Sequence, residues 1–256
     1  MPGSRWLALG GAPRDDCRMS SIGKKVLSGI TGLALCGFII AHLAGNFLLL
    51  VGADPFNEYT RFLTTFAHGF FLPVAEVGLI VVFLTHAGAG IRVALDKRRA
   101  RPVRNAKTGN AGAPSQKTLA SRTMVITGLF LLAFLIVHVW AFRLGPAEAE
   151  GYVTTLDGHE SRDLYRLVIE TFQDARVVAS YTFFMLLLGF HLRHGFWSAF
   201  QSLGANNPKY MPLITTIGVV FAIVIAAGFL SIPIYIYLFI DPPTAASAAT
   251  IMGGAP

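Results

Sequence analysis

Five long apolar runs constrain this chain more than any other feature. They lie at roughly 23–52, 70–95, 120–143, 176–200 and 212–240. Each reaches the length of about 20 residues that an α-helix needs to cross the hydrocarbon core of a membrane. None shows the alternation of a membrane β-strand, and only helices and closed barrels satisfy their backbone hydrogen bonds in lipid. The sequence therefore predicts an all-α fold, an integral membrane bundle of five transmembrane helices.

The connections between these helices differ sharply in charge. The segment 92–122 holds nine Lys or Arg and one acidic residue, whereas 144–175 holds seven acidic residues and two Arg. Basic connections stay on the cytoplasmic side, so we expect a cytoplasmic N-terminus, an external C-terminus and a multi-pass protein of the cell inner membrane. The net charge of +7 then reflects topology and contact with membrane lipid, and we expect no nucleic-acid binding.

We expect three parts along the chain: an N-terminal tail at 1–20, the five-helix domain at 21–241 and a C-terminal tail at 242–256. Residues 1–20 lack an apolar core long enough for a signal peptide. They are either a short disordered tail or lie upstream of a true start at Met19, since "MSSIGKKVLSG" is already a normal lead into a first helix. The basic loop 97–119 is either solvated or docks a partner subunit or phospholipid head groups.

Histidines stand out among the residues of the apolar runs. Of the seven in the chain, five fall inside the predicted spans: His42, His86, His138, His191 and His194. An ionisable side chain in hydrocarbon is costly and usually has a functional reason. One buried histidine is commonly structural, but a histidine on each of four separate helices indicates a binding site.

The depths of these histidines match in pairs. With a rise of about 1.5 Å per residue, His42 and His138 lie in the outer half of the membrane, and His86 and His191 lie nearer the inner ends of their helices, about 10 Å or more away. Two imidazoles at one level on different helices suit a six-coordinate haem iron. We therefore predict two haem b groups with bis-histidine iron ligation, by His42 with His138 and by His86 with His191. No C-x-x-C-H motif occurs, so attachment is non-covalent.

Small and polar neighbours fit the same interpretation. Three glycines, Gly45, Gly90 and Gly195, follow ligand histidines by three or four positions and share their helix faces. They either leave room for a porphyrin or serve ordinary helix packing. His194 lies nearer the water than His191 and is a candidate for a haem propionate or a quinone oxygen.

Other polar side chains have two interpretations each. Arg92 and Arg193 either pair with haem propionates or anchor the helices at the inner surface. Glu76 lies about two turns inside the outer face, so it either serves proton exchange or quinone contact, or bonds a neighbouring helix. The hydroxyls of Ser28 and Thr31 either bond a quinone carbonyl or bond back to their own helix.

Three segments carry a resemblance to a known family: "KKVLSGITGLALCGFIIAHLAGN", "AEVGLIVVFLTHAGAGIR" and "GFHLRHGFWSAFQSLG". Together they resemble the cytochrome b membrane-anchor subunit of succinate:quinone oxidoreductases, in the single-chain, five-helix, dihaem type shared with some bacterial quinol:fumarate reductases. The resemblance covers nearly the whole chain from about residue 19 and weakens in the loops and the last helix.

The resemblance implies an electron-transfer function. It places the axial ligands on His42, His86, His138 and His191, the set that depth predicts. It implies two cytoplasmic partners, a flavoprotein with covalent FAD and an iron–sulfur subunit. In the family, electrons from succinate pass through the iron–sulfur clusters, the inner haem and the outer haem to a quinone, often menaquinone. The chain would thus be a non-flavin subunit of succinate dehydrogenase, linking the tricarboxylic acid cycle to the respiratory chain.

The chain departs from the family pattern at one position, and its histidines have two alternative functional interpretations. Some fumarate-reducing relatives carry a glutamate where this chain has Gly189, which favours succinate oxidation over fumarate reduction. Dihaem quinol-oxidising anchors of fumarate reductase, nitrate reductase or formate dehydrogenase complexes are one alternative. A haem-free transporter that relays protons through histidines is another, and it would require broken helices or inverted repeats around the midplane.

Overall fold

The computed structural model describes residues 20–100 and 119–241. Residues 1–19 of the expected N-terminal tail at 1–20, the expected C-terminal tail at 242–256 and most of the basic loop lie outside the described residues.

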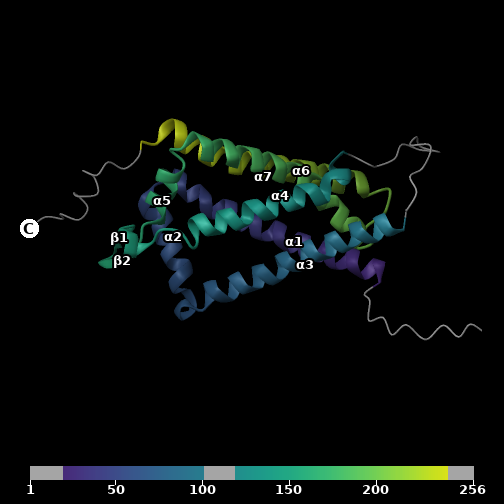
Figure 1. The fold of residues 1–256 in the computed structure, drawn as a ribbon, viewed down its shortest axis with the longest axis horizontal. Coiled ribbons are helices and arrows are strands. Elements are labelled where there is room, and N and C mark those ends of the chain that lie inside the picture. Colours follow the sequence, from purple (N-terminus) through teal and green to yellow (C-terminus); the bar gives the residue numbers. More distant parts are fainter. Residues whose placement is uncertain (1–19, 101–118, 242–256) are drawn as a thin grey trace, which may run out of the picture.

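Five of the described helices are long and apolar enough to cross a membrane. They are α1 (Ser21–Asn46, continued by the 3-10 turn η1, Phe47–Leu50), α3 (Phe71–Arg99), α4 (Leu119–Phe142), α6 (Ala175–Ser202) and α7 (Met211–Phe239). They lie alongside one another with successive helices running in opposite directions (Figure 1). The predicted all-α bundle with five candidate spans is confirmed, with boundaries within a few residues of those expected.

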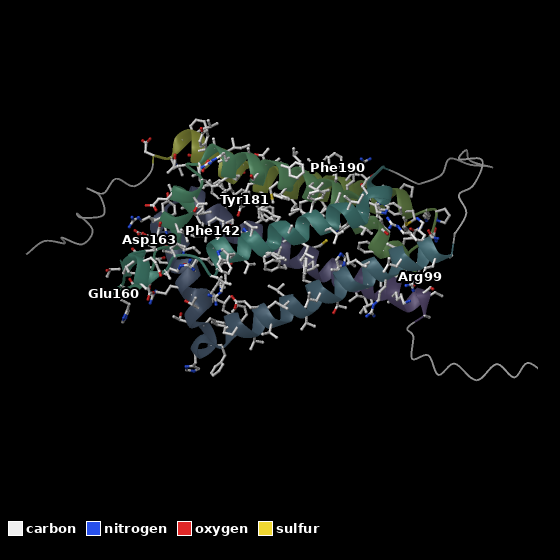
Figure 2. The ribbon with its side chains drawn as sticks, viewed as in Figure 1. Arg99, Phe142, Glu160, Asp163, Tyr181 and Phe190 are labelled. Carbon is white, nitrogen blue, oxygen red and sulfur yellow. The ribbon has the colours of Figure 1, made fainter. Side chains whose placement is uncertain are left out.

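The two ends of the bundle differ in charge, as Figure 2 shows, where Arg99 lies at one end and Glu160 and Asp163 at the other. We call them the basic end and the acidic end. At the basic end, Lys24 Nζ lies 2.7 Å from Asp96 Oδ2 and ties α1 to α3.

The acidic end carries a small folded cap that the apolar runs did not predict. It comprises α2 (Ala53–Thr65), the 3-10 turns η2 (Phe66–Gly69) and η3 (Glu148–Glu150), the antiparallel strands β1 (Val153–Leu156) and β2 (His159–Arg162), and α5 (Leu164–Thr171).

The hairpin of the cap follows from its turn residues. Asp157 and Gly158 join the strands with φ of +50° and +75°, in register with Leu156 opposite His159. Asp-Gly favours this two-residue turn because both positions tolerate positive φ. That dipeptide is the signal from which the hairpin could have been predicted.

A buried amide fastens the two cap helices together. Asn57 on α2 is 2% exposed; its Nδ2 donates to Asp163 Oδ1 at 2.8 Å, and its Oδ1 accepts from the Tyr165 backbone N–H at 3.0 Å. Asp163 also caps α5 by accepting from the Arg166 N–H. On the same helix, burial acts to raise the pKa of Glu170, but hydrogen bonds from Tyr152 and Arg166 outweigh it and leave that pKa below its usual value.

Helix packing brings some pairs of spans closer together than others. In the described residues, α6 packs closely against α7, α1 against α3, and both α1 and α4 against α6. Contact between α1 and α4, and between α3 and α6, is much less extensive. A Cβ added at Gly189 would lie 3.0 Å from Ala226 Cβ, so this position on α6 is packed against α7, and a side chain there would require α7 to shift.

Candidate functional site

The structure brings the intramembrane histidines together in two pairs. The acidic-end pair consists of His42 on α1 and His138 on α4, whose ring centroids are 5.9 Å apart. The basic-end pair consists of His86 on α3 and His191 on α6, at 6.4 Å. These are the pairs that matching depths predict. Each bridges two helices that do not pack closely against each other, α1 with α4 and α3 with α6.

The pair separations suit one iron between two imidazoles. Two metal–nitrogen bonds of about 2 Å, plus roughly 1 Å from nitrogen to ring centre on each side, place the centroids about 6 Å apart. The observed separations are 5.9 and 6.4 Å, with ring planes at 83° and 73° to each other. The donor set and its spacing therefore fit bis-histidine haem.

Hydrogen bonds orient both rings of the basic-end pair. His86 Nδ1 lies 3.1 Å from the Ser28 carbonyl oxygen, and His191 Nδ1 lies 3.0 Å from Thr127 Oγ1. A ring that uses Nδ1 as a donor leaves Nε2 free to bind a metal, an arrangement typical of metal-ligating histidines.

Aromatic rings surround the acidic-end pair. His138 Nδ1 lies 3.1 Å from the Tyr181 hydroxyl, and its ring stacks on Phe134 at 5.6 Å. Tyr181 and Phe142, labelled in Figure 2, are in ring contact and pack against the buried core. His42 stacks on Phe38 at 5.4 Å and lies 5.8 Å from Phe229. The pair is thus enclosed in an apolar environment.

The glycines nearest the imidazoles are not those that sequence spacing singles out. A Cβ at Gly32 would lie 3.1 Å from the His86 ring, and one at Gly128 would lie 3.5 Å from the His191 ring. Gly45 has a different neighbour from the expected porphyrin: a Cβ there would lie 2.6 Å from the ring of Tyr59 on α2. Gly90 faces open space, and the nearest atom to a Cβ at Gly195 is Met124 Cε at 3.7 Å.

Three polar residues lie near the basic end as expected. Arg92 and Arg193 are exposed, and His194 packs edge-on against Trp197 with centroids 4.8 Å apart. His194 Nδ1 is buried without a hydrogen-bond partner among the described residues, so it is available to a polar ligand.

The candidate quinone residues separate into two groups. Glu76 on α3 pairs with Arg143, which directly follows α4, near the acidic end. The Thr31 hydroxyl donates to the Leu27 carbonyl at 2.7 Å, and the Ser28 carbonyl accepts from His86. The Thr31 hydroxyl therefore bonds its own helix, and the Ser28 carbonyl supports the basic-end pair.

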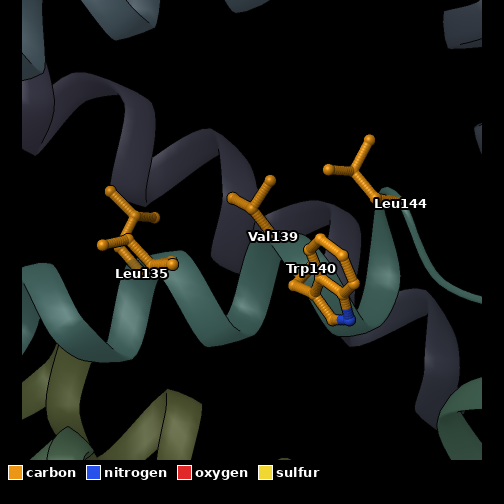
Figure 3. Close-up of a pocket in the computed structure, with 5 residues that line it drawn as sticks. Leu135, Val139, Trp140 and Leu144 are labelled. Atoms are coloured by element: carbon orange, nitrogen blue, oxygen red, sulfur yellow. The ribbon is translucent and has the colours of Figure 1, made fainter.

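An apolar groove of about 270 Å³ lies along the end of α4, as Figure 3 shows. It is lined by Leu135, Ile136, Val139, Trp140 and Leu144. Trp140 is 71% exposed there, as expected for an aromatic residue near a membrane surface. Arg143, the partner of Glu76, directly precedes Leu144 of this groove in the sequence.

No protein-family model, curated protein or solved structure matches this chain. Within the described part of the chain, no three His, Cys, Asp or Glu side chains gather at one point, as they do where protein alone surrounds a metal ion. Bis-histidine ligation of haem takes only two protein ligands.

Proposed function

We propose that this chain is a dihaem cytochrome b membrane-anchor subunit of a succinate:quinone oxidoreductase. The observation that carries the proposal is the two imidazole pairs on four helices, at centroid separations of 5.9 and 6.4 Å. The resemblance of the flanking segments to the family indicates the complex to which the subunit would belong. The five described spans are continuous helices, which supports a cytochrome over a transporter built on broken helices.

In this proposal each histidine pair supplies both axial ligands of one haem b. Haem, when bound, supplies a one-electron redox centre at each of two depths. The protein's part is to hold the imidazoles, to exclude water and to orient Nε2. The aromatic rings around His138 and His42 do this at the acidic end, and the Nδ1 hydrogen bonds of His86 and His191 do it at the basic end.

The basic end is the proposed docking face for the flavoprotein and iron–sulfur subunits. Lys25, Arg98 and Arg99 are exposed there, and basic connections favour the cytoplasmic side. The basic-end pair would then be the inner haem site and the acidic-end pair the outer one, in an inner-membrane protein with a cytoplasmic N-terminus.

Quinone contact is proposed at the groove on α4. The apolar lining suits an isoprenoid tail. Arg143 is the sequence neighbour of Leu144 in the groove, and its ion pair with Glu76 supplies a carboxylate and a guanidinium for the hydrogen bonds and protons that a quinone head group needs.

The decisive experiment is to purify the membrane complex, determine haem b per chain and add succinate. We expect two haems per chain, both reduced by succinate in the presence of the two partner subunits. A chain without haem would refute the cytochrome assignment, while two haems that succinate leaves oxidised would refute only the succinate-linked complex.

Replacing Glu76 with glutamine tests the quinone assignment. We expect the rate of quinone reduction to fall by about tenfold or more, because a positioned acid–base group typically contributes 10²–10⁴ to a rate. Haem content and visible spectra should stay unchanged. The matched control is Glu148→Gln, at an exposed acid of the same end. An unchanged rate in Glu76→Gln would refute the quinone role and leave Glu76 only the structural role of linking α3 to Arg143 at the end of α4.

A further inference from the structure

We infer that Thr127 and Tyr181 are positioning residues that set the tautomer of His191 and His138, and thereby the ligand strength of each imidazole toward iron. The inference rests on the proposed function for the identity of the bound group. Its geometric basis is the pair of side-chain contacts to Nδ1, at 3.0 Å from Thr127 and 3.1 Å from Tyr181.

The direction of the hydrogen bond between Thr127 and His191 follows from the second hydrogen bond of the Thr127 hydroxyl. The Thr127 hydroxyl donates its single hydrogen to the Met124 carbonyl oxygen at 3.0 Å. With that hydrogen so placed, its oxygen faces His191 as an acceptor, and this arrangement requires the proton of His191 on Nδ1. Nε2 is left with a free lone pair. Thr127 is 7% exposed, so lipid and water do not compete for this contact.

His86 also donates from Nδ1, in this case to a backbone carbonyl. The Ser28 carbonyl oxygen can only accept, so His86 Nδ1 also carries its proton. The Thr31 hydroxyl lies farther away, at 3.5 Å, and already donates to Leu27. Thr127 is thus the side chain through which the tautomer of the basic-end pair can be altered by substitution.

The Tyr181 contact differs because a phenol can donate or accept. The Tyr181 ring is packed against Phe172 and Phe134, with centroids 4.9 and 5.0 Å away, which holds the hydroxyl beside His138. Ligation through His138 Nε2 requires Tyr181 to accept from Nδ1. Tyr181 therefore favours the ligating tautomer of His138 less strongly than Thr127 favours that of His191.

These contacts affect the iron through ligand basicity. Donation from Nδ1–H makes an imidazole a stronger ligand and stabilises the oxidised metal, and second-shell hydrogen bonding is one of the means by which a protein sets a haem potential. Removing the acceptor should raise the midpoint potential of the affected haem. It should also weaken haem binding, because loss of such a hydrogen-bond partner typically lowers metal affinity by about 10–100-fold.

Four variants in the full complex test the inference. Thr127→Val keeps the shape and removes the oxygen, Thr127→Ser restores an acceptor, and Tyr181→Phe removes the hydroxyl beside His138. The control is Thr215→Val on α7, where the hydroxyl likewise donates to a carbonyl of its own helix, that of Met211, at 2.9 Å. The readouts are redox titration of each haem, the electron paramagnetic resonance of the ferric haems and haem per chain.

We expect Thr127→Val to raise one midpoint potential and shift one ferric signal, Thr127→Ser to restore both, and Thr215→Val to change neither. Tyr181→Phe should act on the other haem with a smaller shift. Two retained haems with unaltered potentials and signals in Thr127→Val would overturn the inference while leaving the proposed function intact.

A measurement on the unmutated chain removes the dependence on haem. Nitrogen-15 resonances of histidine in the full-length haem-free protein, assigned by comparison with His191→Leu, should show His191 protonated on Nδ1. Protonation on Nε2 would overturn the inference, whether or not the chain proves to bind haem.

Discussion

Replacing His191 with leucine is expected to lower the haem content from two per chain to one. Leucine fills a similar volume and is at home in hydrocarbon, so the helix should persist, but it cannot bind iron. His86 would remain opposite with no partner across the 6.4 Å that now separates the rings. The remaining haem should be held by His42 and His138 and keep its own spectrum and potential. Pyridine haemochrome assay and redox titration measure both.

The matched control lies one turn away on the same helix. His194→Leu removes the other candidate of α6, whose Nδ1 has no partner among the described residues, and should retain both haems. If His194→Leu loses a haem while His191→Leu keeps two, the ligand on α6 is His194. Loss of the signal that belongs to the acidic-end pair in His191→Leu would show that the pairing of the four histidines is different.

The spans and the pairing of the histidines were predictable because both depend on position along single helices. The long apolar runs locate the segments that cross the membrane. Because successive helices run in opposite directions, the position of a residue along its helix gives its depth in the membrane. His42 and His138, and likewise His86 and His191, were matched by depth alone, and the structure places them next to each other.

The neighbours of the imidazoles were not predictable because they lie on other helices. Periodicity identifies which residues share a face with a histidine but not which residue faces it from across the interface. The residues that face a ring from another helix are Gly32, Gly128, Thr127 and Tyr181, and periodicity identifies none of them. Gly45 shares a face with His42, yet Tyr59 occupies the adjacent space because α2 folds back against α1.

The cap was missed for a different reason, since its elements are short and partly polar. The Asp-Gly turn of the hairpin is visible in the sequence, but the contact that fastens α2 to α5 joins Asn57 to Asp163 and Tyr165, more than 100 positions away. Asn57 has no special sequence context, and only its burial and two hydrogen bonds distinguish it from a surface amide.

Replacing Asn57 with leucine is therefore expected to loosen the cap. Leucine has a similar volume but leaves the Tyr165 backbone N–H without its acceptor and removes one donor from Asp163. Each buried polar group left unpaired costs about 1–3 kcal/mol, so the local free energy of opening should fall by roughly 2–4 kcal/mol. Amide hydrogen exchange should accelerate in α5, and proteolysis between 144 and 175 should become faster.

The membrane bundle should withstand this change, because the ring and hydrogen-bond contacts of the four paired histidines come from the spans. Thr64→Leu, at an exposed position of the same helix, is the control and should leave exchange in α5 unchanged. Should Asn57→Leu leave α5 as protected as in the unmodified protein, the bonds of Asn57 would not hold the cap together. Should it also release haem, the cap would be part of the enclosure of the acidic-end pair, whose His42 lies one turn before Asn46, the last residue of α1.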